Sequence, residues 1–268
     1  MKEGNTDSLI REVLAALRDE LKAAYSSIRA IDVRVGLEFT GVLLSTGHGG
    51  VAYTMVERDV GCLALPHAGT IAGKPAAEVV DMCLSRSPVE AAIGVAAVNA
   101  LSQKVFEDHP ERYRPSKTDV LELIRPDDRV AMVGYFGPLI PKILGKSRKV
   151  YVLERRPVMD GRVVNVPRSR WGDILSSSDV ILISGSTIVN KTLADILGLV
   201  GDAREVVLLG PTASMIPEPL FRRGITAEMG VRIVNPEMML RVVSEAGGAR
   251  QLLTHCAEKI AFIKNGEA

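Results

Sequence analysis

The chain has 268 residues, and its 33 lysines and arginines against 32 aspartates and glutamates give a formal net charge of +1. This length allows one large domain or two small ones. Hydrophobic residues make up 47% of the chain and charged residues 24%, a balance that excludes global disorder. A near-neutral chain with only 4% aromatic residues lacks both the positive charge and the stacking side chains of a nucleic-acid binder. We therefore expect no nucleic-acid partner.

The cysteines and the apolar segments indicate the compartment. Cys62, Cys83 and Cys256 are odd in number and form no CxxC pair, which argues against a disulfide framework and favours a reducing environment. The longest uncharged run, 39–56, contains several glycines and predicts a hairpin rather than a membrane span. The charged, amphipathic N-terminus lacks the apolar segment of a signal peptide. We expect a cytoplasmic protein without a membrane span.

The first 110 residues predict a small α+β domain. Apolar residues at helical spacing from Leu9 to Ile28 predict an opening helix. Three short β-type runs follow, at residues 31–37, 39–45 and 51–56. A proline in the first turn favours a helix over 75–84, and Ser87 is the expected cap of a helix over 91–106. The predicted order is one helix, three strands and two helices.

The pattern changes after residues 108–115, a polar segment with two prolines that predicts a linker. Four continuous apolar runs beyond it suit strands buried on both faces of a parallel sheet. These runs span residues 129–134, 149–154, 180–185 and 205–210. Helical patterns are found at 138–145, 190–199, 236–246 and 249–264. The alternation predicts a doubly wound α/β domain over residues 111–268, preceded by an α+β domain over residues 1–110.

The ends of the first two predicted strands of this second domain carry candidate ligand-binding residues, because ligands of open parallel sheets bind beyond the carboxyl ends of the strands. The first strand leads into the turn Gly134, Tyr135, Phe136, Gly137 and Pro138. Neither GxGxxG nor the phosphate loop GxxxxGK[ST] occurs there, but backbone N–H groups of such a turn suit an anion. The second strand ends at Glu154, about 20 residues after Gly134, where a Rossmann fold places an acid on a ribose. Arg155 and Arg156 follow and suit a phosphate or a carboxylate.

The third and fourth strands end in similar small and polar turns. The third leads into Gly185, Ser186, Thr187, Asn190 and Lys191, and the fourth into Gly210, Pro211 and Thr212. A hydroxyl of Ser186 or Thr187 is expected to cap the next helix. The side chain of Lys191 is expected to reach into the cleft and add positive charge for an anion. We expect these turns and Glu154 to line one crevice.

The sequence contains few candidate metal ligands. His48, Glu57, Asp59, Cys62 and His67 are loosely spaced, and none of them forms HxxxH, HExxH or a paired CxxC motif. We keep His48, His67 and Cys62 as candidate ligands and identify no catalytic residue. The absence of a GxSxG elbow and of kinase and zincin motifs argues against those enzyme classes.

Several motifs, taken in order, resemble the family described as "putative heavy-metal chelation". They are IGVAAVNAL at 93–101, GYFGP at 134–138, Glu154, SGSTIVNKTL at 184–193 and LLGPTA at 208–213. The resemblance covers nearly the whole chain. It implies a domain like the enolase N-terminal domain, then a Rossmann-like domain, with a site in the cleft between them and a role in binding or handling heavy metals or metal-containing cofactors. Glu38, Thr40 and Asn99 lie in family-like apolar stretches, where we expect a ligand-facing or hydrogen-bonded role.

Two functions stay open from the sequence. The first is a binding protein that holds an anionic, metal-linked small molecule in the interdomain cleft. The second is an enzyme that uses a nucleotide-type cofactor, S-adenosylmethionine or a nicotinamide, with Glu154 on the ribose. The missing GxGxxG motif favours the first. Both predict an anionic small molecule or a metal complex as the partner, and we also expect a homo-oligomer.

Overall fold

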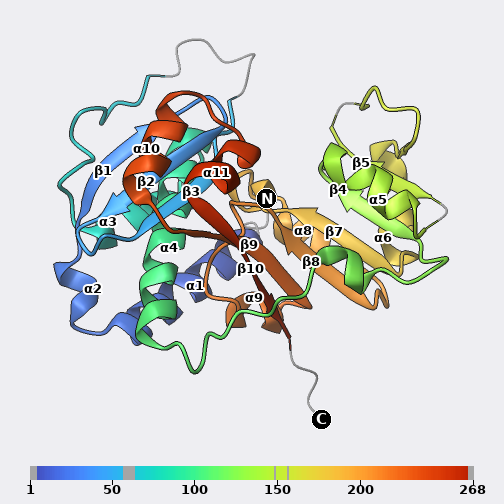
Figure 1. The fold of residues 1–268 in the computed structure, drawn as a ribbon, viewed down its shortest axis with the longest axis horizontal. Helices are drawn as coiled ribbons and strands as arrows, with labels where there is room; N and C mark the ends of the chain where they lie inside the picture. Colours follow the sequence, from blue (N-terminus) through green and yellow to red (C-terminus); the bar gives the residue numbers. More distant parts are fainter. Residues whose placement is uncertain (1–4, 57–63, 148, 156, 265–268) are drawn as a thin grey trace.

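The computed structural model describes residues 5–56, 64–147, 149–155 and 157–264 of the chain. This part of the chain forms two separate sheets, one of three antiparallel strands and one of seven mainly parallel strands (Figure 1). The predicted fold class, an α+β part followed by an α/β part with a mainly parallel sheet, is therefore confirmed. No helix among the described residues is long and apolar enough to cross a membrane.

The small sheet is an antiparallel meander in the N-terminal part of the chain. Its strands are β1 (Ala30–Val35), β2 (Phe39–Leu44) and β3 (Gly49–Tyr53). The helices of this part are α1 (Asn5–Leu21), α2 (Ala24–Ser27), α3 (Ala76–Asp81), η1 (Met82–Leu84) and α4 (Pro88–Asp108). Apart from shifts at their ends and the division of the opening helix into α1 and α2, these elements match the prediction.

Two helices cover opposite faces of the small sheet. Side chains of a strand point alternately to its two faces, so Leu44 of β2 joins the core under α4, whereas Phe39 packs with α10 (Pro236–Ser244). Helix α4 lies close to β3, because a Cβ at Gly50 would be only 2.2 Å from the carbonyl oxygen of Ala96. A C-terminal helix thus packs on the N-terminal sheet, and the domain boundary near residue 110 stays a prediction.

The large sheet has the strand order β10-β9-β8-β7-β4-β5-β6. Its strands are β4 (Val130–Val133), β5 (Val150–Leu153), β6 (Val164–Asn165), β7 (Val180–Ser184), β8 (Glu205–Leu209), β9 (Ala227–Ile233) and β10 (Ala257–Ile263). All neighbours are parallel except β10, which is antiparallel to β9. The chain runs outward from β4 to β6 and then returns to β7 on the other side of β4. This reversal of strand order is the topological switch point of a doubly wound sheet.

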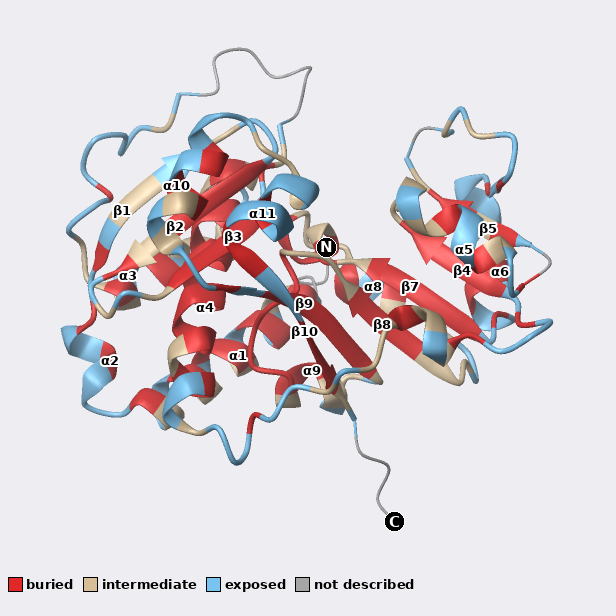
Figure 2. Cartoon of the chain, in the orientation of Figure 1, coloured by how far each residue is buried: buried red, intermediate tan, exposed pale blue. Residues whose placement is uncertain are grey.

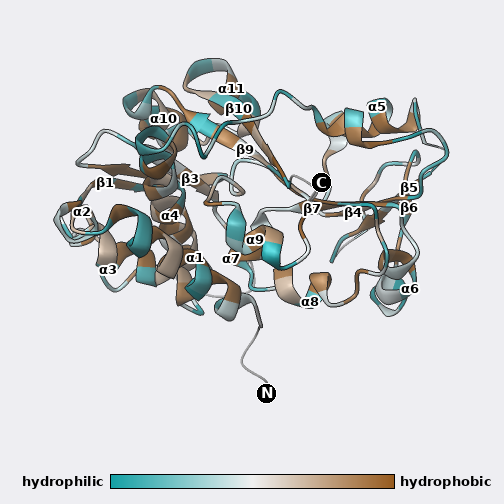
Figure 3. Ribbon diagram, turned by 90° about the horizontal axis from the view of Figure 1, so that it is seen from below, coloured by the Kyte–Doolittle hydropathy of each residue, from teal (hydrophilic) through white to brown (hydrophobic). Residues whose placement is uncertain are grey.

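Helices lie on both faces of the large sheet, whose central strands are buried (Figures 2 and 3). The helices of this part are η2 (Val120–Leu123), η3 (Gly137–Leu139), α5 (Ile140–Leu144), η4 (Arg168–Arg170), α6 (Trp171–Ser176), α7 (Ser186–Val189), α8 (Leu193–Leu197), α9 (Glu218–Arg222), α10 and α11 (Ala249–His255). Met132 of β4 packs with α5 in one core cluster, and its neighbour Val133 joins the cluster of α6 and α8. The alternation explains why the strand sequences are apolar throughout.

Two helix predictions in this part were wrong. The segment predicted as one helix over 249–264 is a short helix, α11, followed by the strand β10. Strand β10 pairs with β9 along its whole length and packs Phe262 against Phe106, with ring centroids 4.8 Å apart, so tertiary pairing overrides the helical pattern. The helix predicted over 190–199 begins later and is shorter: only α8 (Leu193–Leu197) lies in this range, because Lys191 adopts a positive φ of 62° between α8 and the preceding α7.

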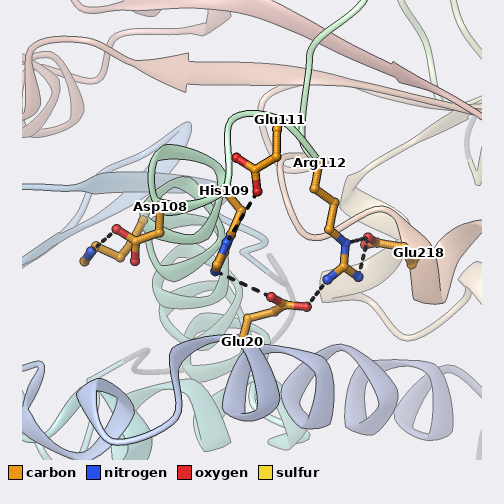
Figure 4. A network of polar contacts seen from close by, with 7 residues as sticks. Glu20, Asp108, His109, Glu111, Arg112 and Glu218 are labelled. Carbon is orange, nitrogen blue, oxygen red and sulfur yellow. Dashed lines mark hydrogen bonds and ion pairs between the residues drawn. The ribbon is translucent and has the colours of Figure 1, made fainter.

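The predicted linker at 108–115 is tied to elements on either side of it (Figure 4). Arg112 forms ion pairs with Glu20 of α1 and with Glu218 of α9, the latter at 2.9 Å from its Nη2 atom. His109 lies 3.7 Å from the other carboxylate oxygen of Glu20. The segment is therefore an ordered connection between α4 and the large sheet.

Candidate functional site

A cleft of about 1820 Å³ opens at the carboxyl ends of β4, β5, β7 and β8. It lies at the switch point between β4 and β7, where ligands of doubly wound sheets bind. Residues of the small sheet and of α11 also line it, so both parts of the chain contribute to its walls. The cleft is larger than the roughly 300–1,000 Å³ of most small-molecule pockets.

The structure brings most of the predicted site residues to this cleft. Those that line it are Gly134, Tyr135, Phe136, Pro138, Glu154, Gly185, Ser186, Thr187, Asn190, Gly210, Pro211 and Thr212. Gly137 lies in the same turn as Phe136, and a Cβ there would be 3.0 Å from the Tyr135 ring. The residues that follow the parallel strands therefore share one cleft.

Glycines make the floor of the cleft compact. Gly134 and Gly210 have φ values of 99° and 111°, a backbone conformation that residues with a Cβ rarely adopt. A Cβ at Gly134 would also lie 2.8 Å from the Cβ of Ser184, and one at Gly185 would lie 2.8 Å from the backbone nitrogen of Ala213. The glycines after β4, β7 and β8 thus allow the turns to pack against one another.

The hydroxyl groups after β7 bond mainly to one another and to nearby backbone. Ser186 Oγ lies 2.9 Å from Ser184 Oγ, and Thr187 Oγ1 donates to the Ser184 carbonyl at 2.7 Å. The cap of α7 is Gly185, and no side-chain cap forms, so the predicted capping by Ser186 or Thr187 was wrong. Both residues instead occupy the first turn. The linked Ser184 and Ser186 hydroxyls keep a further donor for a ligand in the cleft, because each carries one donor and two acceptor sites.

Lys191 does not reach into the cleft, contrary to the expectation from sequence. Its ammonium group donates to the carbonyl oxygen of Cys83 and lies 3.2 Å from Asp7 of α1. The Thr6 hydroxyl accepts from the Ala194 N–H at 2.9 Å and donates to the Lys191 carbonyl at 3.1 Å. The positive φ of Lys191 turns the chain toward α1, so this residue ties the cleft-lining segment to the N-terminal helix.

Asn99 and Thr212 join the N-terminal part to the floor of the cleft. The fully buried Asn99 amide donates to the carbonyl oxygens of Val51 and Thr212, at 2.8 and 2.9 Å. Thr212 Oγ1 in turn accepts from the backbone N–H of Tyr53 at 2.9 Å. Asn99 therefore positions a cleft-lining loop without lining the cleft itself.

Thr40 and Glu38 also lie outside the cleft lining. The Thr40 hydroxyl forms a buried hydrogen bond of 2.9 Å with Thr54, which fits the predicted hydrogen-bonded role. Glu38 is exposed, and its backbone carbonyl accepts from the Thr54 N–H at 2.9 Å.

The candidate metal ligands do not come together. His48 contacts Thr46 and Glu107, His67 is exposed on a turn, and Cys62, like Glu57 and Asp59, lies outside the described residues. Within the described ranges, no three His, Cys, Asp or Glu side chains gather in a way that could hold a metal ion.

Burial also disfavours the two described cysteines as metal ligands. It raises the pKa of Cys83 to about 12 and that of Cys256 to about 11. These thiols therefore stay protonated at neutral pH, whereas metal binding requires the thiolate.

Sequence reasoning missed several lining residues. Phe39, Tyr53 and Trp171 supply aromatic walls, and Arg168 and Arg250 supply positive charge. A search at the carboxyl ends of the predicted strands could not find them, because they come from the small sheet, from the segment after β6 and from α11. The one available signal was Trp171, the single tryptophan in a chain poor in aromatic residues.

Two family models and one curated protein match most of this chain. Two family models, both described as "Putative heavy-metal chelation", match residues 18–102 and 118–262. An uncharacterized protein of Methanocaldococcus jannaschii is 30% identical over 241 residues, which cover 87% of this chain and 89% of that protein.

Two crystal structures of proteins of unknown function from the DUF364 family are also similar. The one from Pyrococcus horikoshii has a TM-score of 0.76 and 26% identity, and the match covers 95% of this chain and 99% of that one. The one from Desulfitobacterium hafniense has a TM-score of 0.74 and 18% identity, covering 95% and 100%, and supports the fold alone.

Proposed function

Because the chain belongs to the family described as "Putative heavy-metal chelation", we propose that it binds and handles a metal ion as part of an anionic small-molecule complex held in the interdomain cleft. The metal is the cargo of this protein, and the organic part of the complex makes the contacts. The turns after β4, β7 and β8 surround this ligand.

One observation carries the proposal: six basic and four acidic side chains line the cleft, but no described histidine or cysteine does. Arg155 and Arg168 both line it, and neither forms an ion pair with a described residue. Unpaired guanidinium groups are suited to carboxylates and phosphates, which they bind through two parallel hydrogen bonds. A site of this composition favours the anionic ligand of a complex over a bare heavy-metal ion.

The proposal is tested by equilibrium dialysis with elemental analysis of the protein compartment. The probes are the nickel(II)–citrate complex and the hydrated nickel(II) ion at equal concentration. We expect the citrate complex to bind about tenfold more tightly, which corresponds to about 1.4 kcal/mol. Equal or tighter binding of the hydrated ion would contradict the proposal, because metal would then be held by protein side chains.

Arg168→Ala is expected to weaken binding of nickel(II)–citrate about fivefold, with a larger effect at low salt, because it removes a cation from the rim of the cleft. Arg170→Ala is the matched control. Both arginines belong to η4 and are exposed, but Arg170 pairs with Asp173 at 3.5 Å and does not line the cleft. Equal losses in the two variants would place the bound complex away from the cleft.

A second function, an enzyme with a nucleotide-type cofactor, is favoured by one observation. Glu154 directly follows β5, the strand beside β4, and its partly buried side chain lines the cleft at the position that contacts ribose in Rossmann folds. Glu154→Ala is then expected to weaken S-adenosylmethionine or a nicotinamide dinucleotide by about 1–3 kcal/mol in calorimetric titrations. Affinities that do not change for either ligand would remove this alternative.

A further inference from the structure

The cleft concentrates the aromatic side chains of a chain that has few. The sequence contains one tryptophan, five tyrosines and five phenylalanines. Those that line the cleft are Phe39, Tyr53, Tyr135, Phe136 and Trp171. Core packing accounts for the buried Phe39 and in part for Phe136 and Trp171, which pack against core clusters. It does not account for Tyr53 and Tyr135, which are 37% and 39% exposed, because an aromatic ring stabilises a fold most when it is buried.

Phe136 lies at the switch point itself. A Cβ at Gly134 would be 3.9 Å from one edge carbon of the Phe136 ring, and a Cβ at Gly210 would be 3.9 Å from the opposite one. The ring therefore spans the turns that follow β4 and β8. In Rossmann proteins the pyrophosphate approaches the backbone of the turn after the first strand, where glycines make room for it. Here a flat apolar group covers that turn.

Trp171 and two arginines form another part of the wall. The Trp171 indole is held in place by a hydrogen bond of 3.1 Å from Nε1 to the carbonyl oxygen of Val166. The Arg168 guanidinium lies 5.8 Å from the centre of the indole ring, within the range of a cation–π contact. Arg155 follows β5 and also lines the cleft. An aromatic ring, Trp171, and a cation without a described ion-pair partner, Arg168, are thus placed next to each other.

We propose that the cleft selects a planar aromatic molecule that carries carboxylate or similar anionic groups. Its ring system packs against Phe136, and its anionic groups point to Arg155 and Arg168. This inference rests on the proposed function and defines the ligand class of that site. It also disfavours a dinucleotide, because the pyrophosphate would need the space that the Phe136 ring occupies.

Two metal-free dianions of similar size test the inference. Pyridine-2,6-dicarboxylate and oxydiacetate each carry two carboxylates on either side of one uncharged donor atom, but only the first is planar and aromatic. We expect calorimetric titration to give at least tenfold tighter binding of the aromatic dianion. The emission of Trp171, the only tryptophan, is expected to change over the same concentration range.

Phe136→Leu is expected to remove most of this preference, by lowering the affinity for the aromatic dianion about fivefold and leaving the aliphatic one unchanged. Phe221→Leu is the control, because Phe221 belongs to α9 and does not line the cleft. If Phe136→Leu fails to fold, Trp171→Leu tests the same preference by calorimetry.

The outcomes separate the two proposals. Equal affinities for the two dianions, or an equal loss of both in Phe136→Leu, would overturn the aromatic selectivity. If neither dianion binds while nickel(II)–citrate does, the selectivity is also overturned, but the proposed function stands. If nickel(II)–citrate also fails to bind, the proposed function fails.

Discussion

Gly230→Ala is expected to lower the free energy of unfolding by about 3 kcal/mol or more. A Cβ at this position of β9 would lie 1.9 Å from the carbonyl oxygen of Ala213 and 2.4 Å from Ser214 Oγ. The strand cannot move aside, because β9 is paired with β8 on one side and β10 on the other. The loop after β8 must therefore shift, and with it the cleft-lining Thr212. Urea denaturation monitored by circular dichroism measures the loss.

Gly161→Ala is the control for this prediction. A Cβ at Gly161 would meet no atom within 4 Å, and its φ is not in the positive region. We expect its stability to stay within about 0.5 kcal/mol of the wild type. If both variants were equally stable, the close packing of β9 against the loop after β8 would be wrong.

Glu228→Gln is expected to change the pH dependence of stability. The Glu228 side chain is 1% exposed; its Oε1 accepts from the Met215 N–H at 2.8 Å, and its Oε2 has no hydrogen-bond partner among the described residues. Burial, with the nearby charge of Glu218 as a smaller cause, raises the pKa of this carboxyl to about 8. The folded protein therefore keeps a proton that the unfolded chain loses near pH 4.5.

The sign of the effect follows from this difference in bound protons. Between about pH 4.5 and pH 8 the folded state binds more protons at Glu228, so stability falls as the pH rises and levels off above pH 8. The loss is on the order of 5 kcal/mol for the wild type. Glutamine keeps the acceptor for Met215 but has no charge to bury, so Glu228→Gln should gain stability relative to the wild type as the pH rises.

Urea denaturation at pH 5, 7 and 9 measures both proteins. We expect a small difference between them at pH 5 and a difference of a few kcal/mol in favour of Glu228→Gln at pH 9. Parallel pH profiles would mean that Glu228 is ionised in the folded protein.

The sequence predicted the elements whose pattern is local. The parallel strands β4, β5, β7 and β8 are largely apolar runs, and each is followed by glycine or glutamate, so the positions just after them could be predicted to line the cleft. Strand β10 was missed, because its residues continue the helical pattern of α11 and only pairing with β9 makes them extended. The two-residue strand β6 is too short to give a pattern.

The cleft was only partly predictable for a similar reason. Residues that follow predicted strands, such as Gly134 and Glu154, could be placed together from topology alone. The direction of Lys191 could not, because it depends on Asp7 and the Cys83 carbonyl, which are distant in sequence. The aromatic wall was missed because Phe39 and Trp171 come from different parts of the chain and share no motif.

The most direct test of a metal complex in the cleft is native mass spectrometry, combined with elemental analysis, of the protein as isolated from cells. The wild type is compared with the double variant Arg155→Ala/Arg168→Ala, and Arg170→Ala serves as the control. We expect the wild type and the control to retain an anionic small molecule together with a metal, and the double variant to lose both. Metal that is bound without an organic molecule, and that the double variant retains, would contradict this account.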